Sequence, residues 1–84
     1  MKRQPMDNYI KDLEQKKAMP KDILTVLKGD GEYDAKLKEK GGRQEVRIKK
    51  GSAMAFMGYT DGKWEVPYGD LRIVREVIDK IKDR

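Results

Sequence analysis

The sequence contains neither cysteine nor histidine. Disulfide bonds and thiolate metal sites are therefore excluded, and the redox compartment of the chain cannot be inferred. The absence of histidine removes the commonest general base, the commonest zinc ligand and the usual pH switch. These two absences narrow the chemistry of the chain before any motif is considered.

Long apolar segments are also missing. The longest apolar run, AMAFM at residues 53–57, is far shorter than the ~20 residues that cross a bilayer. The opening residues MKR are not followed by an apolar stretch, so we expect no secretory signal and no membrane partner, with a cytoplasmic location as the default. With 37% hydrophobic and 42% charged residues, the 84 residues predict one small soluble domain, 1–84, around a modest core.

No segment carries a complete catalytic or cofactor-binding motif. GDGEYD, residues 29–34, lacks the third glycine of a dinucleotide-binding loop, and Ala35 replaces the glycine that a calcium loop requires. Almost every carboxylate falls at a turn, a helix cap or an alternating exposed position, outside the apolar cleft that acid–base catalysis by paired carboxylates needs. We therefore expect no cofactor, no metal site, no catalytic residue and no enzymatic activity.

Helical patterns stand at the two ends of the chain. The first, MDNYIKDLEQKKAMP at residues 6–20, has a narrow apolar stripe and predicts a helical arm over 1–20 that Pro20 stops. Because so weak a stripe does not hold an isolated helix together, the arm docks on the rest of the chain or on a partner, and pairing with its own copy would give a homodimer. The second, residues 70–83, predicts a C-terminal helix capped by Asp70, with a wide apolar face that packs across a sheet.

Residues 22–68 predict an antiparallel β-meander of four to five strands, so the fold class is α+β, a small meander flanked by an N-terminal and a C-terminal helix. Apolar and charged residues alternate within the segments, which is the period of half-buried strands. The segments are bounded by dipeptides typical of tight hairpins: DG at 30–31, GG at 41–42 and DG at 61–62.

Residues 20–29 fit two structures. Pro20 suits the first position of a helix, and a glycine follows at the other end. Thr25, Val26 and the DG that follows favour a strand. We take the strand as the prediction and keep the helix as the alternative.

The hairpins predict definite cross-strand registers. The expected pairs are Leu24–Leu37, Val26–Ala35, Leu37–Val46, Ala35–Ile48, Tyr59–Trp64 and Met57–Val66. The first four place all their apolar partners on one face, as a buried sheet face requires. Pro67 would fall opposite Phe56 at a hydrogen-bonded site and cannot donate there, so the last strand is expected to end near Val66. The predicted core consists of Leu37, Val46, Ile48, Trp64, Val66, Val74 and Ile78.

Positive charge gathers in the first half of the chain. The net charge is +5, yet residues 51–84 contain equal numbers of basic and acidic side chains. The densest stretch, KEKGGRQEVRIKKG at residues 38–51, carries six positive and two negative charges. In the predicted register Lys36 stands opposite Arg47, a like-charge pair that costs stability and that folding alone does not explain.

A sheet face that combines cations with an exposed ring is typical of a nucleic-acid binder, because phosphates contact the charges and bases stack on the ring. We therefore predict a nucleic-acid-binding protein, with single-stranded and duplex substrates both left open. The candidate binding residues are Lys36, Lys38, Arg43, Arg47, Lys49, Lys50 and Phe56.

A solvated face is the plainer interpretation, since lysines also keep small proteins soluble and protect sheet edges. The alternative function is a non-catalytic adaptor or inhibitor that occupies a site on a partner protein, with an acidic surface as the contact. Five methionines, with Met54, Phe56 and Met57 clustered, would suit such an adaptable apolar contact.

Overall fold

The structure, a computed structural model, describes residues 6–83. Its elements are α1 (Met6–Gln15), α2 (Pro20–Leu27), β1 (Asp34–Lys40), β2 (Arg43–Lys50), β3 (Ala53–Thr60), β4 (Lys63–Trp64), β5 (Tyr68–Gly69) and α3 (Leu71–Lys82). The antiparallel strands follow the order β1-β2-β3-β4, and β5 also pairs with β3. The predicted α+β fold, a meander with a helix at each end, is confirmed.

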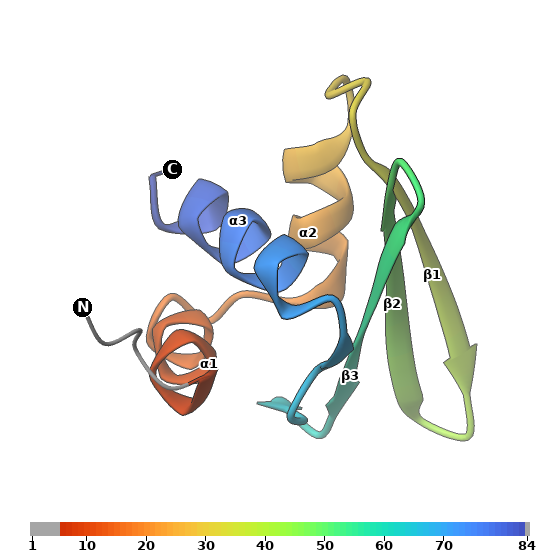
Figure 1. The fold of residues 1–84 in the computed structure, drawn as a ribbon. Helices are drawn as coiled ribbons and strands as arrows, with labels where there is room; N and C mark the ends of the chain where they lie inside the picture. The colour runs from red at the N-terminus through yellow and green to blue at the C-terminus, as the bar shows by residue number, and fades with distance from the viewer. Residues whose placement is uncertain (1–5, 84) are drawn as a thin grey trace.

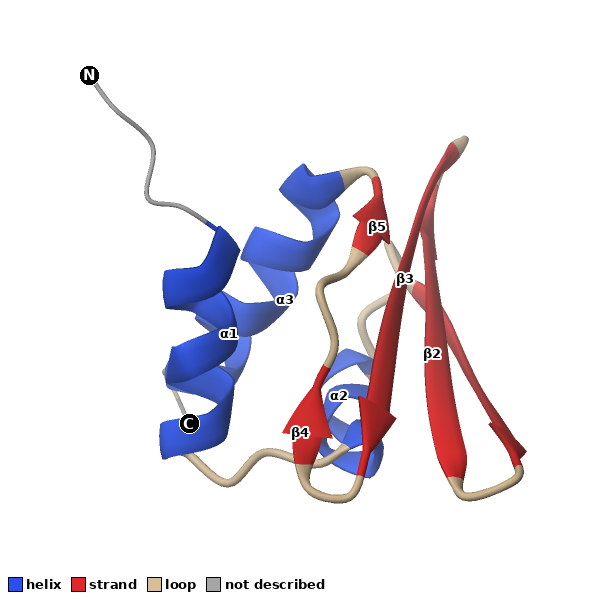
Figure 2. Ribbon diagram, turned by 90° about the horizontal axis from the view of Figure 1, so that it is seen from below, coloured by secondary structure: helices blue, strands red, loops and turns tan. Residues whose placement is uncertain are grey.

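The helices cover only one face of the sheet. Figure 1 shows α1, α2 and α3 on the same side of the strands. Figure 2, seen from below, likewise shows the long strands β2 and β3 at the side of the molecule away from α1 and α3. Because neighbouring residues of a strand point to opposite faces, each strand sends every second side chain to the helices and the others to the bare side. We call these two sides the inner face and the outer face.

The inner face and the helices form one core. The buried apolar side chains are Ile10, Leu13, Ala18, Ile23, Leu27, Val46, Ile48, Ala55, Met57, Trp64, Ile73, Val74, Val77, Ile78 and Ile81. The Trp64 indole N–H donates to the backbone carbonyl of Ala18 at 3.0 Å, which ties the end of the sheet to the segment after α1. No helix within residues 6–83 has the length and hydropathy of a membrane span.

The apolar stripe of α1 is used within the chain. Ile10 and Leu13 are both buried in the core. The helix therefore docks on the rest of the chain, which is one of the two arrangements expected from the sequence. Pairing with a second copy through the same helix stays a prediction.

The central hairpin has the predicted register. Leu37 faces Val46 and Ala35 faces Ile48, and all four belong to the inner face. The loop at 41–42 has positive φ at both glycines, 59° and 81°, which is the type I′ turn that matches the twist of two-residue hairpins. The expected pairing of Tyr59 with Trp64 across the 61–62 turn is also confirmed.

Residues 20–27 form helix α2, so the predicted strand was wrong and the alternative was right. Pro20 is the first helical residue, and the N–H of Met19 donates to the Asp22 carboxylate at 2.7 Å in a capping arrangement. A helix places Ile23 and Leu27 on one side, one turn apart, and both are buried against the inner face.

Two pairings fail with the strand. Leu24–Leu37 and Val26–Ala35 do not exist, because β1 pairs with β2 alone among residues 6–83. The dipeptide at 30–31 lies in a loop between a helix and a strand. Its turn is closed by a Tyr33 N–H that donates to the Asp30 carbonyl at 3.2 Å.

The last strand is interrupted, and Val66 is not a core residue. Its side chain is 70% exposed, and it has no pairing with Met57. Pro67 cannot donate to β3, so the strand ends at Trp64. One more backbone bond follows, from the Glu65 N–H to the Gly58 carbonyl at 2.8 Å, and strand pairing resumes at Tyr68. Continuous alternation from Trp64 would have turned Tyr68 to the inner face, whereas the interruption brings it opposite Phe56 on the outer face.

Candidate nucleic-acid interface

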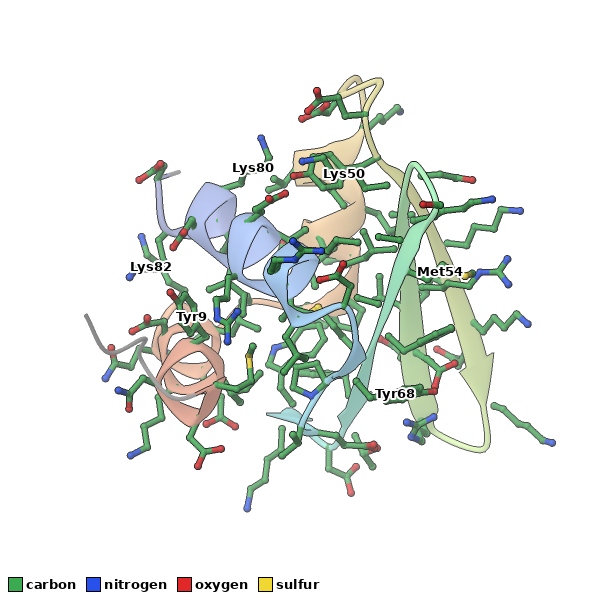
Figure 3. All side chains as sticks on the ribbon, in the orientation of Figure 1. Tyr9, Lys50, Met54, Tyr68, Lys80 and Lys82 are labelled. Atoms are coloured by element: carbon green, nitrogen blue, oxygen red, sulfur yellow. The ribbon has the colours of Figure 1, made fainter. Side chains whose placement is uncertain are left out.

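The outer face is a four-strand surface without a helix over it. Its side chains come from Asp34, Lys36, Lys38 and Lys40 of β1, Arg43, Glu45, Arg47 and Lys49 of β2, Met54, Phe56 and Thr60 of β3, and Tyr68 of β5. Figure 3 shows Met54 and Tyr68 on the side of the sheet that faces away from the helices. The register therefore brings together residues that are up to 34 positions apart in the sequence.

One row crosses the middle of this face. Cross-strand pairing aligns Lys36 with Arg47, Arg47 with Phe56, and Phe56 with Tyr68. Two cations thus adjoin two rings in a single line perpendicular to the strands. The like-charge pair predicted from the sequence is present in this register.

The two rings of the row are stacked. The centroids of Phe56 and Tyr68 lie 4.8 Å apart with 14° between their planes. The Tyr68 hydroxyl donates to the Glu45 carboxylate at 3.3 Å, which holds the ring in place, although the residue is 53% exposed. Desolvation, together with the nearby Glu45 charge, raises the pKa of Tyr68 above its ordinary value, so the hydroxyl stays protonated at neutral pH.

Gly69 allows β5 to approach β3 this closely. Its φ is +96°, and a side chain there would put Cβ 2.5 Å from the Met54 carbonyl oxygen. A glycine is therefore required next to the stacked tyrosine.

Four predicted site residues lie on the outer face: the register sets Lys38 opposite Glu45 and Lys49 opposite Asp34, whereas Lys36 and Arg47 face each other. Within residues 6–83, no carboxylate forms an ion pair with Lys36, Lys38, Arg47 or Lys49. A hollow of about 230 Å³ lies beside the row and is lined by Lys38, Lys40, Arg43 and Glu45. Lys38 and Lys40 are the cations of this lining that an anionic group there would contact.

Arg43 also lies on this face, but its charge is engaged. Its Nε and Nη2 donate to the two carboxylate oxygens of Glu65 at 2.8 Å each, and its Nη1 donates to Glu45 at 3.2 Å. These bonds raise the pKa of Arg43 and lower that of Glu65. Arg43 therefore serves to fix Glu45 beside the rings and has little charge left for a ligand.

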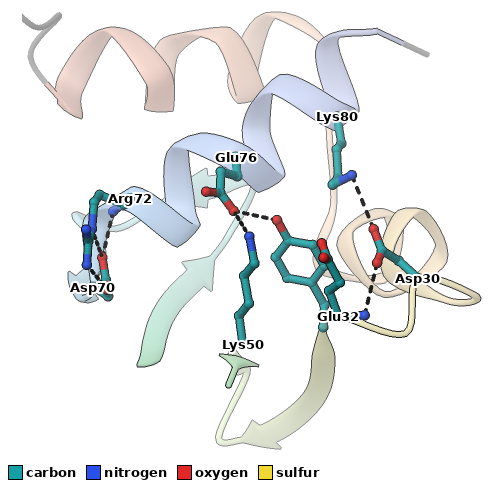
Figure 4. Close-up of polar contacts among 8 residues, drawn as sticks. Asp30, Glu32, Lys50, Asp70, Arg72, Glu76 and Lys80 are labelled. Carbon is teal, nitrogen blue, oxygen red and sulfur yellow. Dashed lines mark hydrogen bonds and ion pairs between the residues drawn. The ribbon is translucent and has the colours of Figure 1, made fainter. Parts of the chain in front are cut away.

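Lys50 lies on the other side of the sheet, apart from the rest of the predicted site. Its Nζ contacts the Glu76 carboxylate of α3 at 2.9 Å and lies 5.1 Å from the centre of the Tyr33 ring. The Tyr33 hydroxyl donates to the same carboxylate, and both bonds lower the pKa of Glu76 (Figure 4). The structure thus uses Lys50 to hold β2 to α3.

Other cations on the helical side are paired in the same way. Lys80 of α3 contacts Asp30 at 3.3 Å, also shown in Figure 4, and Lys82 contacts Asp12 of α1 at 3.2 Å. Lys50, Lys80 and Lys82 thus join separate parts of the chain, whereas the cations in the central row of the outer face do not.

Tyr68 was not among the predicted site residues. Alternation through Trp64 and Val66 pointed it inward, and only the interruption at Pro67 reverses its direction. The signal in the sequence was Pro67 itself, since a proline that cannot pair opposite Phe56 requires the chain to leave and rejoin the sheet.

Comparisons with known proteins add no assignment. The chain matches no protein-family model, no curated protein and no solved structure. Within residues 6–83, the acidic side chains form no cluster of three that could hold a metal ion. The geometry of the outer face is therefore what points to a function.

Proposed function

We propose that the protein binds single-stranded nucleic acid on the outer face. The observation that carries the proposal is the central row, in which Lys36 and Arg47 adjoin the stacked rings of Phe56 and Tyr68 on a face without helices. Phosphates would contact the cations, and bases would stack on or beside the rings.

Charge supports a polyanionic ligand. Lys36 and Arg47 face each other across two strands without an acidic partner within residues 6–83, at a cost to the folded state. A phosphate between them would replace repulsion by attraction. Lys38 and Lys49 flank the row on the same face and would contact the neighbouring phosphates.

The rings favour a single strand over a duplex. A duplex keeps its base faces stacked on one another and offers a protein mainly phosphates and groove edges. The outer face is a sheet surface with no helix to enter a groove, and its exposed ring, Tyr68, is useful only to an unstacked base.

Fluorescence anisotropy with a labelled single-stranded oligonucleotide, and with its duplex, tests the proposal over a series of salt concentrations. We expect tighter binding of the single strand, with log affinity falling by ~0.7 per phosphate contacted as log salt rises. Absence of binding to the single strand at low salt would refute the proposal. Tighter binding of the duplex would show that base stacking on Phe56 and Tyr68 does not contribute to binding.

A matched pair of charge variants tests the position of the site. The double variant Lys36→Glu, Arg47→Glu should abolish binding and leave the thermal midpoint nearly unchanged, because one like-charge pair replaces another. The control Lys11→Glu, Lys21→Glu makes the same change in net charge on exposed positions of α1 and α2 and should retain most of the binding. Equal losses in both variants would mean that net charge alone attracts the ligand.

One observation favours a second candidate function, a non-catalytic adaptor or inhibitor. Val66 and Tyr68 are exposed large apolar side chains, at 70% and 53%, and Tyr68 lies in the row that contains Lys36 and Arg47. An acidic protein surface with an apolar centre would also fit this combination. Binding to such a partner would depend much less steeply on salt than binding to phosphates.

A further inference from the structure

The outer edge of β1 is a second surface with unsatisfied bonding groups. Within residues 6–83, β1 pairs with β2 on one side only, so its other side is a free edge over Asp34–Lys40. An unpaired strand edge offers a row of backbone donors and acceptors to another extended chain.

The hairpin turn determines which backbone groups point to this edge. In a two-residue hairpin the residues that flank the turn, Lys40 and Arg43, form a hydrogen-bonded pair, and the pairs then alternate along the strands. It follows that Ala35, Leu37 and Glu39 direct their N–H and C=O groups away from β2. Lys36 and Lys38 direct theirs to β2.

A groove runs beside the start of this edge. It has a volume of about 490 Å³ and is lined by the end of α2, the loop after it and the first residues of β1, including Leu24, Leu27, Asp30, Tyr33 and Ala35. Leu24 is only partly buried. A strand added to β1 would lie ~4.8 Å outside it and would direct every second side chain toward the helical side, where Leu24, Leu27 and Ala35 are the aliphatic part of the groove lining.

The alternate side chains of an added strand would lie on the outer face, beside Lys36, Lys38 and Lys40. These lysines form no ion pair within residues 6–83. Opposite charges on neighbouring strands are favourable and like charges are not. Acidic residues in the added strand would therefore be selected on this side.

The geometry points to strand addition at the β1 edge by an extended peptide that alternates apolar and acidic residues. The apolar residues occupy the groove side, next to Leu24 and Ala35, and the acidic residues pair with Lys36 and Lys38. This surface does not include the ring pair, although it shares Lys36 and Lys38 with the proposed nucleic-acid site; the inference is carried by the free backbone edge and the groove, so it does not depend on nucleic-acid binding.

A second copy of the chain is a poorer occupant of the same edge. If two β1 strands paired antiparallel about Leu37, the longest overlap, Lys36 of each copy would face Lys38 of the other. These two like-charge pairs at the centre oppose that arrangement, and the two Asp34–Lys40 pairs at its ends are attractive, so a second copy lacks the uniform charge complementarity of an acidic peptide. An alternating acidic peptide has the opposite charge at the same positions.

Amide hydrogen exchange measured by NMR on the full chain tests the inference. The probe is a peptide alternating glutamate and valine, and its control has the same residues arranged in two blocks. At about ten times its Kd, the alternating peptide should slow exchange of the Ala35, Leu37 and Glu39 amides by about tenfold, because about a tenth of the edges then remain open. The Lys36 and Lys38 amides, already bonded to β2, should change little.

Several results would overturn it: no protection, equal protection by the block peptide, or protection that rises with protein concentration without peptide, which would assign the edge to a second copy. Two variants support the assignment. Ala35→Pro removes one outward N–H and should weaken peptide binding. Lys36→Glu with Lys38→Glu should reverse the preference, so that a lysine–valine alternating peptide binds instead of the glutamate one.

The ring variant Phe56→Ala separates this inference from the proposed function. It should leave peptide binding unchanged while it weakens binding of single-stranded nucleic acid. Ala35→Pro should do the reverse. If each of these two variants weakened binding of the peptide and of the nucleic acid equally, the two ligands would not bind at different places.

Discussion

Lys49 and Lys50 are neighbours in the sequence and have opposite roles in the structure. Lys49 points to the outer face and has no ion pair within residues 6–83. Lys50 points to the helices, where its Nζ contacts Glu76 at 2.9 Å and lies beside the Tyr33 ring. The pleat of β2 alone separates an available cation from a structural one.

The same division applies to the two faces as a whole. On the helical side, Lys50 joins β2 to α3, Lys80 joins α3 to the loop after α2, and Lys82 joins α3 to α1. On the outer face, the central row leaves Lys36 and Arg47 unpaired beside two rings. A count of basic residues therefore overstates the site, because only the outward ones are available to a ligand.

The largest contrast between the faces should be in stability. Ile48 is fully buried on the inner face, so Ile48→Ala should lower the free energy of unfolding by about 3 kcal/mol through lost burial and a cavity. Lys49, the next residue, is exposed, so the control variant Lys49→Ala should change the free energy of unfolding little. Urea unfolding followed by tryptophan fluorescence measures both, and similar losses would contradict the assignment of faces.

The next contrast is in binding. Phe56→Ala with Tyr68→Ala should weaken binding of single-stranded nucleic acid about tenfold to a hundredfold, since base stacking is worth ~1–3 kcal/mol per base. Tyr68→Phe is the matched control, because it keeps the ring and removes only the hydroxyl bond to Glu45. Anisotropy titrations at fixed salt compare them. If the double variant bound single-stranded nucleic acid with unchanged affinity, only the charges of the outer face would account for binding.

A single charge reversal should move stability and binding in opposite directions. Lys36→Glu converts the like-charge pair with Arg47 into an attractive one, which should raise the thermal midpoint by about 1–4 °C. The same change should weaken nucleic-acid binding several-fold. A midpoint that falls would show that the pair is not repulsive in the folded protein.

The smallest effect is expected on the helical side. Glu76→Gln weakens the contacts of this side chain with Lys50 and Tyr33 and should lower the thermal midpoint by no more than about 4 °C, with nucleic-acid binding unchanged. The pKa of Glu76 is below its usual 4.5 in the folded chain. Its contribution is therefore complete above that pH and is lost as the pH falls through the folded pKa. The difference between wild type and variant should shrink in acid, and a constant difference from pH 3 to 7 would exclude the carboxylate as its source.

The central hairpin shows how much local pattern determines. Two glycines with positive φ fix a two-residue turn, and the turn fixes every pair from Lys40–Arg43 to Asp34–Lys49. The opposition of Lys36 and Arg47, and the outward direction of both, could therefore be predicted from residues 34–49.

Two errors show where local pattern fails. Residues 20–27 have local features of a strand and of a helix, and burial of Ile23 and Leu27 over the inner face favours the helix. Pro67 interrupts the last strand, and the direction of Tyr68 depends on where the chain rejoins β3. Both outcomes depend on elements distant in the sequence.

The hairpins, the C-terminal helix and the alternation that turns Lys36 and Arg47 to one face follow from local sequence, because turn chemistry and strand period act over a few residues. Three features follow from tertiary packing instead: the three helices pack on the other face, Lys50 forms an ion pair with Glu76 and is not available to a ligand, and Tyr68 stacks on Phe56. Those outcomes depend on which apolar surfaces bury one another across the whole chain, and no local pattern specifies that choice.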